Sequence, residues 1–296
     1  MSLTSRQFFQ LAKCSFLAWS EDDASSMGAA IAFYTLFSIA PLLIIIIAAV
    51  GFIWGEDAVR GEVIRQLGGL VGSQGAESVQ QLIRSADRPM QGVTATIVSA
   101  FILLVGATRV FAELQSALDR IWKVPALEHT AGWWRMLRAR LLSLGLVLGM
   151  SFLLLVSLAI GAALAAFGAW ISGLFPGWEV LLQALNTLAS LAISTTLFAV
   201  IFKYMPQASI AWRDVWVGAI VTGVLFEIGK LLIGLYVGKS STVSSLTAAG
   251  SLVIVLIWVY YAAQVFLLGA EFTWFYANHH GTRAGMKPAV GSPSKQ

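Results

Sequence analysis

The sequence predicts an all-α fold, specifically a polytopic integral membrane protein with six transmembrane helices and additional amphipathic helices at the membrane surface. Hydrophobic residues make up 58% of the chain and charged residues 11%, with a mean hydropathy of +0.79. A soluble domain carries about twice this fraction of charge. The stretch from Leu141 to Phe202 contains a single charged residue, Glu179. Because one helical crossing of a hydrocarbon core of about 30 Å needs about 20 residues, this stretch predicts two consecutive spans.

Six apolar segments are long enough to cross a bilayer, and they divide the chain. They cover residues 28–54, 90–108, 141–170, 179–203, 214–238 and 248–275. Together they form a membrane domain over residues 24–280, preceded by a cytoplasmic amphipathic helix within residues 1–23 and followed by a disordered cytoplasmic tail over residues 281–296. Pro41, in the first span, lacks a backbone N–H and predicts a kink there.

Two segments between spans have helical periodicity without being apolar enough to span. Residues 56–88 form an outer insertion, in which glycines at 68, 69, 72 and 75 separate two predicted short amphipathic helices. Residues 109–123 carry apolar side chains on one face and predict a cytoplasmic helix that ends before Pro125.

The distribution of Lys and Arg predicts the orientation of the spans. These residues gather near the N-terminus, between the second and third spans, after the fourth span and in the tail. By the positive-inside rule both termini are therefore expected in the cytoplasm. The net charge of +4 follows from this topology, and we expect no nucleic-acid binding. The most basic aromatic segment, residues 133–140, directly precedes a span and is better explained as an interfacial anchor.

Ionisable and amide side chains inside the spans are the candidate functional residues, because each is costly in lipid. Glu227 and Lys230 are spaced i, i+3 and lie about 20 Å along the fifth span from Arg213, near the bilayer centre. They either form a structural ion pair between helices or mark the wall of a cavity that holds a polar head group. Gln264, near the middle of the last span, is a further candidate, although single amides usually bridge helices.

Charged residues at the cytoplasmic ends of three spans form a second set of candidates. Arg109, Lys203 and Glu271 end the second, fourth and sixth spans at the same depth. An Arg109–Glu271 ion pair is therefore allowed by the predicted geometry, while the alternative is that each charge is only a membrane anchor.

Motifs for catalysis or metal binding are missing from the sequence. The three histidines fall outside the predicted spans, Cys14 is the single cysteine, and there is no phosphate-binding loop or His-Glu-x-x-His motif. No carboxylate cluster has the spacing of a two-metal hydrolase. We therefore expect no metal, no cofactor and no enzymatic activity.

Several ordered blocks of the chain resemble the YihY/BrkB family of bacterial inner-membrane proteins, once labelled ribonuclease BN. The blocks are Ala29-Ala-Ile-Ala-Phe-Tyr34-Thr-Leu-Phe-Ser38-Ile-Ala-Pro41-Leu-Leu, Gly106-Ala-Thr-Arg109-Val-Phe-Ala-Glu113-Leu-Gln115-Ser-Ala-Leu-Asp119-Arg-Ile-Trp122, Gly218 through Glu227, Lys230 and Tyr236, Gly250-Ser-Leu-Val, Trp258-Val-Tyr260-Tyr261 and Gly269-Ala270-Glu271-Phe-Thr. The resemblance implies six helices, a cytoplasmic N-terminus and location in the bacterial inner membrane. It adds Tyr34, Tyr236 and Tyr260 as pathway candidates, and Glu113 and Asp119 as partners in ion pairs.

Two functions follow as hypotheses from these features. The first is a carrier or channel, not driven by ATP, that moves a lipid or another amphiphile and contributes to envelope integrity, an association that the family resemblance suggests together with resistance to serum killing. The alternative is a membrane scaffold that docks a periplasmic or cytoplasmic protein partner. Nuclease activity is not expected, because no side-chain set could activate water against a phosphodiester.

Overall fold

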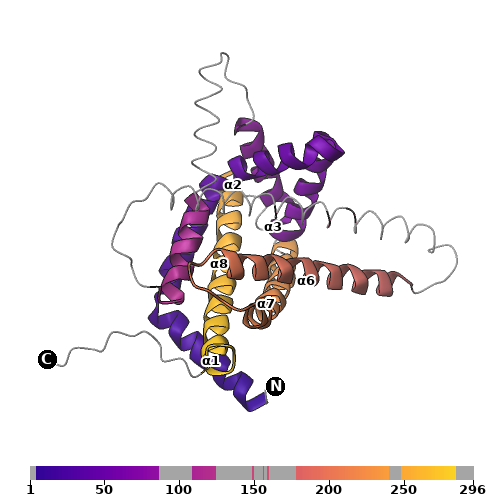
Figure 1. Ribbon diagram of the computed structural model, residues 1–296. Helices are drawn as coiled ribbons and strands as arrows, with labels where there is room; N and C mark the ends of the chain where they lie inside the picture. Colours follow the sequence, from indigo (N-terminus) through magenta and orange to yellow (C-terminus); the bar gives the residue numbers. More distant parts are fainter. Residues whose placement is uncertain are drawn as a thin grey trace.

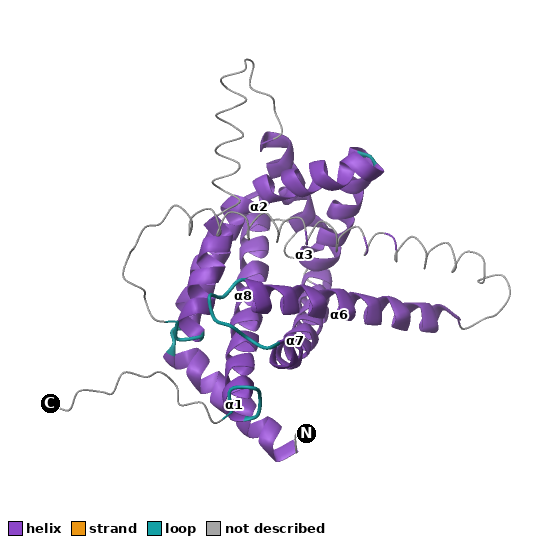
Figure 2. Ribbon diagram, in the orientation of Figure 1, coloured by secondary structure: helices purple, strands orange, loops and turns teal. Residues whose placement is uncertain are grey.

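The computed structural model describes residues 5–86, 109–124, 178–239 and 248–284, and the single positions 149, 156 and 159. All regular secondary structure in this part of the chain is helical, which confirms that the fold is all-α (Figures 1 and 2). The labelled helices are α1 (Ser5–Glu21), α2 (Ala24–Trp54), α3 (Glu56–Ala86), α6 (Trp178–Tyr204), α7 (Trp212–Lys239) and α8 (Ala248–His279). A further helix covers residues 109–121.

Three described helices are long and apolar enough to cross a membrane. They are Gln183–Tyr204, Trp212–Leu232 and Val255–His279. Helix α2 adds a fourth if its two parts, Ala24–Ala40 and Leu42–Phe52, form one span; the parts meet at 48°, as the predicted kink at Pro41 requires. The predicted spans at 90–108 and 141–170 lie outside the described residues, apart from three single positions, so the count of six spans stays a prediction.

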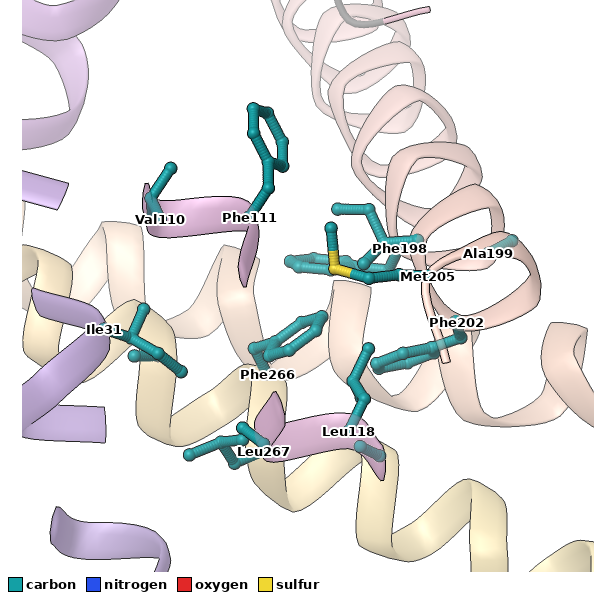
Figure 3. Packing of buried hydrophobic residues seen from close by; sticks show 14 of the residues in the cluster. Ile31, Val110, Phe111, Leu118, Phe198, Ala199, Phe202, Met205, Phe266 and Leu267 are labelled. Carbon is teal, nitrogen blue, oxygen red and sulfur yellow. The ribbon is translucent and has the colours of Figure 1, made fainter. Parts of the chain in front are cut away.

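Helix α8 lies at the centre of the fold and packs against α1, α2, α3 and α7 (Figure 1). Aromatic side chains join it to α6: the rings of Phe266 and Phe202 are 5.1 Å apart, and those of Phe266 and Phe198 are 6.3 Å apart. Figure 3 shows these rings grouped with Met205, with Leu118 and Phe111 of the 109–121 helix next to them. The core therefore connects the candidate spans in α6 and α8 to the 109–121 helix, which is not itself a candidate span.

The crossing of α7 and α8 depends on two reciprocal glycine–threonine contacts. Thr222 donates a hydrogen bond to the carbonyl of Gly218 one turn earlier (2.8 Å), and Thr273 donates one to that of Gly269 (2.7 Å). A Cβ atom at Gly218 would lie 1.7 Å from Thr273 Oγ1, and one at Gly269 would lie 1.8 Å from Thr222 Oγ1. Each threonine thus satisfies its own hydroxyl and fills the space above the opposite glycine, so the helices can approach closely.

The helices at the N-terminal side differ in part from expectation. Helix α3 covers Glu56–Ala86, but it bends back on itself at the predicted glycines: a Cβ atom at Gly68 would lie 3.9 Å from the Ala76 Cβ atom, whereas residues eight apart on a straight helix are about 12 Å apart. Each arm buries an apolar pair at i, i+4 spacing, Val59 with Val63 and Val79 with Ile83, as expected of two short amphipathic helices. In α1, Leu11 packs against Phe272 and Tyr276 of α8 and Trp19 is half-buried against the core, but Phe8 and Phe16 are 45% and 57% exposed.

Polar contacts close one end of the bundle. The Asp119 carboxylate, at the end of the 109–121 helix, accepts hydrogen bonds from the backbone N–H (2.7 Å) and the side-chain amide (3.1 Å) of Gln207 in the α6–α7 loop. Asp214, 1% exposed in the first turn of α7, accepts bonds from the backbone N–H (3.1 Å) and hydroxyl (2.6 Å) of Thr282. These contacts fasten the 109–121 helix and the segment after α8 to the α6–α7 connection.

Replacing Asp214 with Ala is expected to release the segment that follows α8. Thr282 loses both of its hydrogen bonds, and a local loss of about 1.4 kcal/mol raises the open population about tenfold. Arg283, whose guanidinium donates to the carbonyl of Ser209, should then become a faster site of trypsin cleavage by that factor. The matched control is Asp57→Ala, an exposed acid in the first turn of α3. An unchanged cleavage rate after Arg283 in Asp214→Ala would contradict the assignment.

Candidate functional site

Three polar side chains on the apolar helices α6 and α7 contact one another in a closed triangle. Lys230 Nζ is 2.7 Å from Glu227 Oε1. Ser190 of α6 completes the triangle: its hydroxyl donates to Glu227 Oε1 (2.9 Å) and accepts from Lys230 Nζ (2.9 Å). We call Ser190, Glu227 and Lys230 the polar triad. Its charges cancel and its hydrogen bonds are mutual, so the triad can exist in an apolar span at a tolerable cost.

The polar triad lies at the edge of an exposed apolar surface rather than deep within the helices. The side chains of Lys230 and Glu227 keep exposures of 19% and 16%. Val224 and Leu231, spaced i−3 and i+4 from Glu227 on the same helical face, are exposed by 41% and 67%. In a bilayer such a face contacts lipid, so the triad presents a hydrogen-bonding and charged spot at the border between the protein and the acyl chains.

Aromatic side chains lie beside the polar triad and connect it to the core. Lys230 Nζ lies 5.8 Å from the ring centroid of Phe226, close enough for a cation–π contact. Phe226 packs edge-on against Phe198 (5.5 Å) and Trp258 (5.7 Å). Tyr261 of α8 donates a hydrogen bond to the carbonyl of Leu225 (3.3 Å). The backbone of α7 next to the triad is therefore held in place by α6 on one side and α8 on the other.

The other pathway candidates do not join the polar triad in the described part of the chain. Gln264 lies against Gly28, and its amide Nε2 is 3.4 Å from the carbonyl oxygens of Ala24 and Ser25 at the start of α2, so it bridges two helices. Tyr34 is half-buried and packs edge-on against Phe33. Tyr260 is 37% exposed. The side chain of Tyr236 lies outside the described residues.

The boundary charges have partners that the sequence did not suggest. Lys203 donates a hydrogen bond to the carbonyl of Ile210 and lies 5.8 Å from the ring centroid of Trp212. Glu113 is half-buried on the 109–121 helix. The Arg109–Glu271 ion pair that the predicted geometry allowed is absent, although both residues belong to the described ranges: Arg109 is exposed, and the charged groups that act on Glu271 are Asp22 and Lys123. Near Glu271, α8 therefore meets the turn after α1 and the C-terminal end of the 109–121 helix, whereas Arg109 is at the N-terminal end of that helix.

Sequence reasoning missed two residues of the site. Ser190 is one of several hydroxyl residues in its apolar span, and its pairing with Glu227 depends on the α6–α7 packing. Tyr260 was chosen from an aromatic pair, but its neighbour Tyr261 makes the contact with α7. Tyr261 lies over Gly229, where a Cβ atom would come within 2.1 Å of the ring. Gly229, one residue before Lys230, was the feature of the sequence that indicated a close approach of another helix to α7 beside the polar triad.

The all-helical architecture and its apolar helices define a helical membrane protein. The chain belongs to the family described as Virulence factor BrkB, whose model matches residues 15–292. It is similar to a UPF0761 membrane protein of Pseudomonas aeruginosa, with 29% identity over 253 residues, 84% of this chain and 58% of the relative. It is also similar to a UPF0761 membrane protein of Psychrobacter, with 23% identity over 260 residues, which cover 86% of this chain and 46% of the relative.

A third relative, a UPF0761 membrane protein of Klebsiella pneumoniae, is 29% identical over 200 residues, 66% of this chain and 63% of its own length. The chain therefore spans about half to three fifths of the length of the curated relatives that it matches. Their names state a membrane protein and no enzymatic activity. No solved structure matches the chain.

Proposed function

We propose that this protein is a carrier or channel, not driven by ATP, for a lipid or another amphiphile in the inner membrane of a bacterium, with both termini in the cytoplasm. The position of the polar triad at the rim of an exposed apolar face carries the proposal. A lipid that moves along this face keeps its acyl chains on the apolar side chains while its head group meets Lys230, Glu227 and Ser190. Envelope integrity is the process to which such transport contributes.

The chemistry of the polar triad supports a head group as its ligand. The ammonium of Lys230 can donate to a phosphate or carboxylate oxygen, and the carboxylate of Glu227 can accept from an amine or hydroxyl. Both groups are accessible from the apolar surface, and neither needs to leave the triad fully, because Ser190 bonds to both. A charge-assisted hydrogen bond contributes about 1.5–3 kcal/mol, which corresponds to roughly tenfold or more in affinity.

Native mass spectrometry of the protein released from lipid nanodiscs tests the proposal. Wild type should retain a defined lipid, and the neutral, similarly shaped double variant Glu227→Gln/Lys230→Met should retain it at least about tenfold less. The matched control is Glu62→Gln/Arg65→Met, which removes another i, i+3 ion pair, on α3 outside the candidate spans. This control should bind the lipid as wild type does.

Two outcomes would contradict the proposal. If the double variant of the polar triad retains the same lipid at the same level, the triad is a structural ion pair and the site lies elsewhere. If wild type retains no defined lipid, the carrier is not supported, and chemical cross-linking to one dominant envelope protein would then favour the scaffold.

A further inference from the structure

The hydrogen bonds that the polar triad does not make among the described residues indicate which head group fits it. The ammonium of Lys230 has three N–H donors. One is taken by Glu227 Oε1 (2.7 Å) and one by the Ser190 hydroxyl (2.9 Å). Ser190 and Lys230 both contact the Oε1 atom of Glu227, whereas no described residue bonds to its Oε2 atom. The triad therefore has one N–H donor and one carboxylate oxygen left for a ligand.

These two remaining groups have opposite charges and lie close together. Glu227 and Lys230 are three residues apart, about 4.5 Å along the axis of α7. A ligand that satisfies both groups must present an anion to Lys230 and an N–H donor to Glu227. It must also be neutral overall, because the triad is neutral and a net charge would stay unbalanced beside the acyl chains. A zwitterion with a phosphate and a protonated amine has these properties.

The surface around the polar triad favours a zwitterion that carries acyl chains. Ile220, Val224 and Leu231 lie at i−7, i−3 and i+4 from Glu227, share its helical face, and are exposed by 51%, 41% and 67%. Apolar surface therefore lies on both sides of the triad along α7. A soluble zwitterion would leave this surface uncovered, whereas the chains of a phospholipid bound by its head group would cover it.

Other phospholipid head groups satisfy the polar triad less well. The quaternary ammonium of a choline head group has no N–H, so Glu227 Oε2 would gain no hydrogen bond from it. A glycerol head group can donate from its hydroxyls, but its lipid has a net negative charge, which the Glu227 carboxylate repels. This repulsion is a means of rejecting anionic lipids, in addition to the attraction for a zwitterion.

We propose that the ligand of the polar triad is a zwitterionic aminophospholipid, whose phosphate accepts a hydrogen bond from the Lys230 ammonium and whose protonated amine donates to Glu227 Oε2. The Ser190 hydroxyl, bonded to both side chains, keeps them in place while the ligand is bound. This inference rests on the proposed lipid carrier or channel and specifies the chemical class of its ligand.

A series of lipids with increasing N-methylation tests the hydrogen bond to Glu227. The full-length protein is placed in nanodiscs with equal amounts of dioleoyl phosphatidylethanolamine, its N-monomethyl and N,N-dimethyl derivatives, and dioleoyl phosphatidylcholine. All four lipids are zwitterionic and have the same acyl chains, and only the last has no N–H. Native mass spectrometry of the released wild-type protein should show phosphatidylcholine retained at least about tenfold less than phosphatidylethanolamine. The two intermediate lipids should be retained more than phosphatidylcholine.

A second competition, between phosphatidylethanolamine and phosphatidylglycerol, tests the charge balance. Wild type should retain phosphatidylethanolamine at least about tenfold more. Glu227→Gln leaves Lys230 as an unbalanced positive charge, so its preference should move toward the anionic phosphatidylglycerol. The matched control is Glu62→Gln on α3, which removes another acid of an i, i+3 ion pair with a similar exposure of 12%, and it should keep the wild-type preference.

The results separate this inference from the proposed function. Equal retention of phosphatidylethanolamine and phosphatidylcholine by wild type, or a wild-type preference for phosphatidylglycerol, would overturn the head-group assignment and leave the lipid carrier or channel standing. The assignment would also fail if Glu227→Gln kept the wild-type preference. Retention of none of these lipids by wild type would contradict both proposals. If Glu227→Gln does not fold, the wild-type competitions decide the question.

Discussion

Replacing Lys230 alone with Met is expected to lower the free energy of unfolding by about 3–5 kcal/mol, because it leaves the Glu227 carboxylate uncompensated in an apolar span. The Ser190 hydroxyl would still donate to this carboxylate but cannot balance its charge. The expected loss should appear as a lower melting temperature of the purified protein in mild detergent, and as less folded protein in the membrane fraction.

The double variant Glu227→Gln/Lys230→Met separates a lost charge balance from lost packing. It removes both charges while keeping similar side-chain volumes, and replacement of a buried ion pair as a whole is often close to neutral. We therefore expect its stability to return to within about 1–2 kcal/mol of wild type. A double variant as unstable as Lys230→Met would show that the side-chain contacts of the triad, and not its charges, are what matters.

Arg65→Met provides the comparison outside the span. Arg65 pairs with Glu62 at the same i, i+3 spacing outside the candidate spans. Its own side chain is 70% exposed, and Glu62, which is 12% exposed, keeps a hydrogen bond from the amide of Gln66 (3.0 Å). Ion pairs at a solvated helix surface contribute at most about 1 kcal/mol, and Gln66 still donates to Glu62, so this variant should unfold nearly as wild type does. An equal loss of stability in Arg65→Met and Lys230→Met would contradict the importance of the apolar surroundings.

Those features of the fold that depend on local sequence could be predicted. The mean hydropathy predicted a helical membrane protein, Pro41 predicted the bend in α2, and the i, i+3 spacing predicted the Glu227–Lys230 ion pair. Each of these follows from a few adjacent residues and the geometry of a single helix. The glycines of α3 likewise mark a bend, since residues of poor helix propensity lie between its two arms, both of which pack against the core.

Contacts between distant segments could not be predicted in the same way. Ser190 reaches Glu227 only because α6 and α7 cross at that height, and the sequence contains several other hydroxyl groups in apolar segments. Glu271 was paired with Arg109 from their common depth, yet depth says nothing about which helices are neighbours around the bundle. The structure instead places Asp22 and Lys123 at Glu271, from a turn and a helix end whose direction no periodicity indicates.

Replacing Gly218 with Ala is expected to be the most damaging single-methyl change at the α7–α8 crossing. The new Cβ atom would lie 1.7 Å from Thr273 Oγ1 and 3.2 Å from the Thr273 Cα atom, so the backbones of the two helices must move apart. Overpacking of this kind costs about 1–3 kcal/mol, and it must also outweigh the roughly 1 kcal/mol by which Ala favours a helix over Gly. The melting temperature in detergent should fall, and less folded protein should be recovered.

Two further variants decide whether the contact with Thr273 causes this loss. Gly61→Ala, in α3, places its Cβ atom where nothing lies within 4 Å, so this control should be neutral or slightly more stable than wild type. Adding Thr273→Ala to Gly218→Ala removes the hydroxyl but leaves the Thr273 Cβ atom 2.8 Å away, so we expect only partial recovery. If Gly218→Ala is as stable as Gly61→Ala, α7 and α8 do not approach as closely at this position as the reciprocal glycine–threonine contacts require.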